Sequence, residues 1–168
     1  MKKILVIQDL SCVGKCSVTV ALPILSAMGI NCSALPTAVL STHTGFPGPH
    51  VVPLTEHISA IGSHFDALGV TFDAVTTGYL SDPEQAEAVL EVMTAFDCPV
   101  ILDPAMADHG KLYYGFDEAY AHAMGALCGA ADIALPNITE ASFLTGMEYK
   151  ETYDRAYIDE IIAKGALS

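Results

Sequence analysis

The sequence predicts an α/β fold of three layers, in which a mostly parallel sheet has helices on both faces. Short apolar runs alternate along the chain with segments of helical period, which is the order expected of a parallel sheet with crossover helices. The apolar runs also end at polar groups, as strands do where they reach a ligand crevice. The 168 residues, 52% hydrophobic and 16% charged, indicate one compact domain.

Five apolar runs are the predicted strands, and they cover residues 4–7, 38–40, 74–76, 100–102 and 133–135. The polar groups that follow them are Gln8 and Asp9, Ser41 to Thr44, Thr77 to Tyr79, Asp103, and Asn137. The carboxyl ends of parallel strands share one edge of a sheet. We therefore expect these groups to lie along one crevice.

Five segments have a helical pattern and cover residues 17–28, 55–68, 82–96, 117–130 and 154–164. The clearest starts at Asp82, a good N-cap, with Pro83 at the first helical position. The helix after Thr55 should end at Gly69. Pro23 lies inside the first segment and predicts a kink or a later helix start.

The longest predicted loop, residues 41–53, contains three prolines and is expected to be a lid or binding loop. After the helix near residues 154–164 the alternation requires another strand, whereas only Gly165 to Ser168 follow. We therefore expect residues 1–168 to be the N-terminal portion of a longer domain.

Charge and cysteine usage restrict the partners and the compartment. Seven Lys and Arg against 20 Asp and Glu give a net charge of −13, which argues against a nucleic-acid partner. The apolar stretch after Met1 is too short for a signal peptide, and no run approaches the ~18 apolar residues of a membrane span. The five cysteines are odd in number and scattered, as reduced thiols are. We expect a cytoplasmic protein without a membrane partner.

A glycine-containing turn, residues 10–17, leads from the first predicted strand into a helix. It resembles a P-loop, but Asp9 stands where the motif needs Gly, and Cys16 where it needs Ser or Thr. The remaining turn offers free N–H groups to an anion or a polar ligand. A simple tight turn is an equally good interpretation.

Acidic and amide side chains gather after the last two predicted strands. Asp103 and Asp108 follow one strand, and Asn137 and Glu140 follow the next, all with oxygen atoms suited to a hydrated Mg²⁺ ion. The alternative for the aspartates is an Asp-Pro turn with a solvated Asp108. The alternative for Asn137 and Glu140 is a helix cap, and the two roles are compatible.

Taken together, these motifs resemble those of the pyridoxal and pyridoxamine (vitamin B6) kinases of the ribokinase-like superfamily. The resemblance rests on Gln8, residues 41–45, residues 77–80, residues 102–106 with Asp108, and residues 136–140. It implies transfer of the γ-phosphoryl group of ATP to the 5′-hydroxyl of pyridoxal, pyridoxamine or pyridoxine. It also implies ATP and Mg²⁺ as cofactors, a monovalent cation as a further candidate, and a homodimer.

The resemblance implies a role for each matching position. By this resemblance, the vitamin pocket is lined by Gln8, Asp9, His43, Thr44 and Tyr79. The resemblance also implies that the ATP phosphates and their cations are bound on the side of Asp103, Asp108, Asn137 and Glu140. Asp103 and Glu140 are the implied metal ligands.

Two departures from the family pattern stand out. Asp9 occupies a position where the family often has Ser, and a carboxylate there should favour a protonated ring nitrogen. The family's catalytic base lies in a Gly-x-Gly-Asp turn, which does not occur in this sequence. No catalytic residue is therefore assigned within the chain, and we expect no kinase activity from these residues alone.

Three other functions remain open at this stage. A hydroxymethylpyrimidine kinase acts on another flat heteroaromatic alcohol and would differ in which alcohol it turns over. A non-catalytic protein that binds a B6 vitamer would lack a continuation with Gly-x-Gly-Asp. A flavodoxin-like domain would carry a bound yellow flavin.

Overall fold

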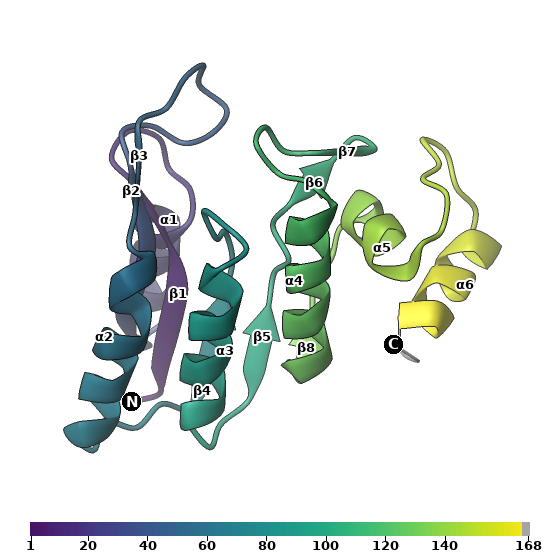
Figure 1. Cartoon of the computed structure of the whole chain (residues 1–168). Helices are drawn as coiled ribbons and strands as arrows, with labels where there is room; N and C mark the ends of the chain where they lie inside the picture. The colour runs from purple at the N-terminus through teal and green to yellow at the C-terminus, as the bar shows by residue number, and fades with distance from the viewer. Residues whose placement is uncertain (166–168) are drawn as a thin grey trace.

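In the computed structural model, which describes residues 1–165, the main sheet has the strand order β3-β2-β1-β4-β5-β8 (Figure 1). Its strands are β1 (Lys3–Ser11), β2 (Asn31–Leu40), β3 (Val51–Pro53), β4 (Ala74–Thr77), β5 (Val100–Leu102) and β8 (Ile133–Ala134). All neighbouring pairs are parallel except β2 and β3. A separate hairpin consists of β6 (Ala107–Asp108) and β7 (Lys111–Leu112).

The helices are α1 (Val18–Ala27), α2 (Thr55–Ala67), α3 (Gln85–Ala95), α4 (Glu118–Ala130), α5 (Ile138–Thr145) and α6 (Arg155–Gly165). In Figure 1, α1 lies behind the sheet, whereas α2, α3 and α4 lie in front of it. The predicted three-layer α/β fold is confirmed. Within residues 1–165, no helix has the length and apolar character needed to cross a membrane.

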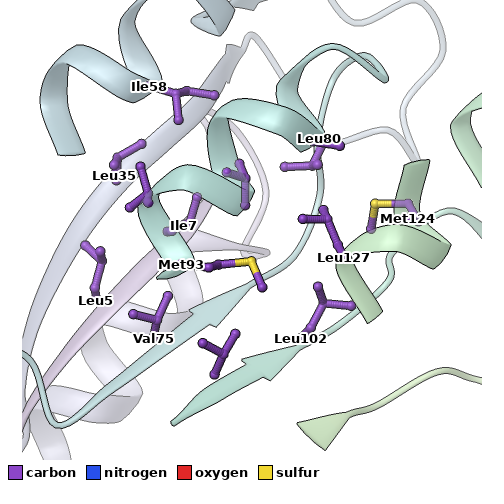
Figure 2. Packing of buried hydrophobic residues seen from close by; sticks show 14 of the residues in the cluster. Leu5, Ile7, Leu35, Ile58, Val75, Leu80, Met93, Leu102, Met124 and Leu127 are labelled. Atoms are coloured by element: carbon purple, nitrogen blue, oxygen red, sulfur yellow. The ribbon is translucent and has the colours of Figure 1, made fainter. Parts of the chain in front are cut away.

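The main hydrophobic core lies between the sheet and α2, α3 and α4. The sheet contributes inward-facing side chains such as Leu5, Ile7 and Leu102, which are fully buried. Met93 of α3 and Leu127 of α4 pack against them (Figure 2). Burial of side chains of this size stabilises the fold by roughly 1.5–3 kcal/mol each.

Two predicted strands, β1 and β2, are several residues longer in the structure than their apolar runs. β1 continues through Gln8 and Asp9, which therefore lie within the strand and not after it. Gln8 pairs with Pro36 and Leu10 pairs with Val39, so β2 has one extra residue at this point. This β-bulge bends β2 near its carboxyl end, and such bulges often redirect side chains beside a site.

The helices start within a few residues of the predicted positions: α2 begins one residue early, at Thr55, and α3 begins late. α3 begins at Gln85, because residues 81–84 form a turn in place of the first predicted helical turn. The Asp82 carboxylate still accepts the Gln85 N–H at 3.0 Å, so its capping contact is retained. α1 begins at Val18 and contains Pro23, so of the two alternatives the later helix start is wrong and the kink stays a prediction.

Candidate functional site

A cavity of about 260 Å³ lies at the carboxyl ends of β1, β4 and β5, where the strand order reverses around β1. Open α/β sheets bind their ligands at such a switch point. Its wall consists of Gln8, Ser17, Val20, Ala21, Gly78, Tyr79, Asp103 and Ala105. The cavity thus joins the end of the sheet to the first turn of α1, and three predicted site residues meet in it.

Gln8 enters the cavity because residue 78 has no side chain. A Cβ atom on Gly78 would lie 2.9 Å from Gln8 Nε2 and 3.0 Å from Gln8 Cγ. The Gln8 amide therefore passes directly over the backbone that follows β4. This places a hydrogen-bond donor and acceptor in the cavity wall that Tyr79 also lines.

Tyr79 forms an aromatic wall of the cavity, and its backbone is firmly held. Thr37 Oγ1 donates a hydrogen bond to the Tyr79 carbonyl oxygen at 2.8 Å, across the end of β1. Gln85 is fully buried and binds the Thr37 carbonyl and the Ser81 N–H. Burial raises the pKa of Tyr79, and the charges of Asp9 and Asp82 raise it further, so its hydroxyl stays neutral.

Asp103 provides the anionic side of the cavity. Its backbone N–H donates to the Thr77 carbonyl, which continues the β4–β5 pairing to the rim of the cavity. Part of the residue is open to solvent, yet the surrounding protein raises the pKa of its carboxyl group by desolvation. A partly desolvated carboxylate at a cavity wall is a suitable ligand for a cation.

Asn137 and Glu140 form a complete capping box at the start of α5. The Asn137 amide oxygen accepts the Thr139 and Glu140 N–H groups. The Glu140 carboxylate accepts the Asn137 N–H at 2.8 Å and the Met106 N–H at 3.2 Å. The cap interpretation is therefore confirmed, and Glu140 also ties α5 to the segment after β5.

Glu140 is 2% exposed and lies near Asp103. Burial raises the pKa of Glu140, backbone donors oppose that shift, and the Asp103 charge raises it further. Because backbone donors occupy its carboxylate, Glu140 suits a cation through an intervening water better than by direct contact. Asp103 fits a directly bound Mg²⁺ ion better.

Asp108 lies on the β6–β7 hairpin, which contacts the start of α5 through a 2.8 Å hydrogen bond from the Asn137 side chain to the Ala107 carbonyl. The Asp108 carboxylate accepts the N–H of the adjacent His109 at 2.8 Å, and its side chain is 55% exposed. Within residues 1–165, no group of three or more His, Cys, Asp or Glu side chains is arranged to hold a metal ion. The gathering of all four phosphate-side residues around one cation therefore stays a prediction.

Asp9 is 3% exposed and is not part of the cavity wall. Successive side chains of a strand point to opposite faces, so Asp9 diverges from Gln8. The Ser11 hydroxyl donates to the Asp9 carboxylate at 2.8 Å. Asp9 lies close enough to Tyr79 for its charge to raise the tyrosine pKa, so it approaches that wall from the other face.

The loop between β2 and β3, whose sequence includes His43 and Thr44, extends beyond the carboxyl end of β2 (Figure 1). Ser41 and His50 close its base through two hydrogen bonds of 2.9 Å. The His43 ring packs against the backbone of Gly14, where a Cβ would lie 2.1 Å from its Cδ2. Thr44 is exposed, and neither residue belongs to the wall of the 260 Å³ cavity, so their pocket roles stay predictions.

A larger hollow of about 1090 Å³ lies elsewhere, between α4, β8, α5 and α6. Its wall is mostly apolar and includes Leu135, Phe143 and Ile162, each more than a third exposed. It contains none of the predicted vitamin-pocket residues. We assign the candidate site to the smaller cavity, because polar groups from three strand ends converge there.

Comparison with known proteins agrees with this architecture. A phosphomethylpyrimidine kinase family model matches residues 22–167. A pyridoxine/pyridoxal/pyridoxamine kinase of Bordetella pertussis is 30% identical over 84% of the chain and 53% of its own length.

Two solved structures resemble the chain over nearly its whole length. A Bacteroides thetaiotaomicron protein crystallised with pyridoxal is 38% identical, with a TM-score of 0.94 over 98% of this chain and 59% of that one. A Leishmania donovani pyridoxal kinase in complex with ADP and pyridoxamine is 28% identical. Its TM-score is 0.85, and the match covers 99% of this chain and 59% of that one.

The chain spans about half the length of the curated relatives that it matches, 49% and 53% of the first two. The resemblance to vitamin B6 kinases found in the sequence is nevertheless confirmed along most of the chain. The matched family model covers far more than half of these residues. The chain belongs to the phosphomethylpyrimidine kinase family.

Proposed function

We propose that the protein takes part in the ATP-dependent phosphorylation of the 5′-hydroxyl of a B6 vitamer, and that this chain supplies the vitamer pocket. The observation that carries the proposal is the cavity where Gln8, Tyr79 and Asp103 meet at the switch point of the sheet. It combines an aromatic wall, an amide and a carboxylate, as a flat ring with polar substituents requires.

The parts of the pocket have separate tasks in this proposal. Tyr79 packs against the pyridine ring, and the Gln8 amide offers a hydrogen bond to one of its substituents. Asp103 would hold a magnesium ion, and the nearby Glu140 would add negative charge to that side of the site. The metal would neutralise phosphate charge, which is the main requirement of phosphoryl transfer.

A hydroxymethylpyrimidine is the second candidate substrate, because the family model that matches the chain is that of phosphomethylpyrimidine kinases. Both candidates are flat nitrogen heterocycles with a hydroxymethyl group. Asp9 lies outside the cavity, but its negative charge acts on the Tyr79 wall and thus favours a bound ring nitrogen that carries a proton. A pyridine meets this condition more readily than a pyrimidine, so we rank the B6 vitamer first.

Equilibrium dialysis of the purified chain with pyridoxine and with hydroxymethylpyrimidine tests the proposal. We expect pyridoxine to bind more tightly, and Tyr79→Leu to weaken its binding. Tyr114→Leu is the matched control, because Tyr114 is fully exposed. Tighter binding of the pyrimidine would favour the second candidate, and binding of neither compound would refute the pocket assignment.

The same proposal includes a cytoplasmic location and a homodimer. All five cysteines are free thiols in the structure, which suits a reducing compartment. The homodimer rests on the family resemblance alone. Sedimentation of the purified chain would test it directly.

A further inference from the structure

Three aromatic rings form a continuous stack from the cavity wall into the core. The Tyr79 and Phe116 rings lie 5.7 Å apart between centroids with 30° between their planes. The Phe116 and Tyr120 rings are nearly parallel, 3.6 Å apart with 9° between planes. Phe116 therefore lies between a wall of the proposed vitamer pocket and a residue of α4.

The inner end of this stack is fixed. Tyr120 is 1% exposed, and its hydroxyl donates to the Leu80 carbonyl at 2.9 Å and accepts the Leu80 N–H at 3.3 Å. The Asp117 side chain accepts the Tyr120 N–H and caps α4 at the same point. Because Tyr120 cannot easily rotate, it provides a rigid support for the Phe116 ring.

The outer end of the stack depends on packing. Thr37 holds the Tyr79 carbonyl, and Tyr120 holds the backbone of the next residue, Leu80. Neither contact restrains the Tyr79 ring. Across residues 1–165 no hydrogen bond is formed by the Tyr79 hydroxyl, so the ring has no polar anchor. Its orientation is left to its neighbours, and Phe116 is the ring stacked on it.

We propose that Phe116 is a positioning residue for substrate recognition, which sets the orientation of the Tyr79 ring and thereby the affinity of the cavity for a planar heteroaromatic ring. The inference rests on the proposed vitamer site. Phe116 itself is absent from the cavity wall, so its effect on binding passes through Tyr79.

The test combines binding with a direct report of ring orientation. Phe116→Leu removes the ring. Phe116→Met also removes it and serves if the leucine variant fails to fold, because its unbranched side chain adapts to the space. Phe116→Tyr keeps an aromatic ring at this position. Tyr114→Leu is the control, an exposed aromatic residue on the same loop. Pyridoxine affinity is measured by dialysis. The Tyr79 ring resonance is followed in chain labelled with ¹³C-tyrosine, and is assigned by its loss in Tyr79→Phe.

We expect Phe116→Leu to shift the Tyr79 ring resonance without ligand and to weaken pyridoxine binding about threefold to tenfold, the range of one aromatic pair. Phe116→Tyr should restore both values, and Tyr114→Leu should leave both unchanged.

The failures are distinguishable. If the unaltered chain binds no pyridoxine, the proposed function fails, and the substrate role of Phe116 fails with it. If the unaltered chain binds and the ring-deleted variants bind equally well, only the inference is overturned. Weaker binding with an unchanged Tyr79 resonance would also overturn it, because the effect would not pass through that ring.

Discussion

Tyr120→Phe removes one hydroxyl that satisfies both backbone groups of a buried residue. Leu80 is 1% exposed, and its C=O and N–H contact the Tyr120 oxygen at 2.9 Å and 3.3 Å. Burial raises the pKa of Tyr120 far above its ordinary value, so the hydroxyl remains a donor at every working pH. The substitution leaves a buried donor and a buried acceptor unpaired, without a change in packing volume.

The expected loss follows from the two contacts. A buried polar group without a partner costs ~1–3 kcal/mol, and the 3.3 Å contact is the weaker of the two. We expect a loss of about 2 kcal/mol in the free energy of unfolding, which lowers the melting temperature by roughly 4–8 °C.

Urea and thermal unfolding at pH 7 provide the measurement, with Tyr114→Phe as the control. Tyr114 is fully exposed, so its variant should stay within about 0.5 kcal/mol of the unaltered chain. Equal stability of the Tyr120 and Tyr114 variants would refute the reasoning, because it would mean that the Leu80 groups do not depend on this hydroxyl.

The remaining predictions concern the acidic side of the site and the reaction. The pKa of Asp103 is raised in the folded chain, so ionisation of this carboxyl group opposes folding. The folded state is fully stabilised below the ordinary pKa of 3.8, and this stabilisation is lost as the pH rises through the raised pKa. Asp103→Asn should therefore raise the melting temperature by about 1–2 °C at pH 7 and leave it unchanged near pH 3. An equal rise in melting temperature at pH 7 and pH 3 would contradict the prediction. Magnesium with ADP should stabilise the unaltered chain more than that variant, as measured by thermal melting. Glu140→Ala should cost about 1–3 kcal/mol in urea unfolding because the Met106 and Asn137 N–H groups lose their acceptor, and an unchanged midpoint would show that water replaces it. Incubation of the chain with ATP, Mg²⁺ and pyridoxal should yield no 5′-phosphate, whereas product proportional to enzyme would place the base within these residues, with Asp108 as the first candidate.

Helix positions were predictable because their signals are local. Asp117, Asn137 and Asp154 each accept a backbone N–H in the first turn of the helix that follows. Residues 31–37 of β2 were not predicted, since the apolar run that indicated this strand covers only residues 38–40. That segment is a strand because it pairs with β1, which is a contact distant in sequence.

The site was predictable where it depends on strand ends. Gln8, Tyr79 and Asp103 meet in one cavity because the carboxyl ends of parallel strands share an edge. Asp9 could not be placed from its position after an apolar run, because it lies inside β1 and strand alternation directs it to the other face. Phe116 was missed, since its stacking on Tyr79 joins segments 37 residues apart and leaves no periodic signal. Its spacing of four residues from Tyr120 was the available clue.

Titration of the ¹⁵N-labelled chain with pyridoxine, followed by amide chemical shifts, tests the location of the vitamer site most directly. The largest shifts should fall at Gly78, Tyr79 and Asp103, which surround the cavity at the ends of β4 and β5. Shifts confined to the hollow between α4 and α6, around Gly125 and Ile161, would contradict the assignment. No shifts at a millimolar vitamer concentration would contradict the proposed function itself.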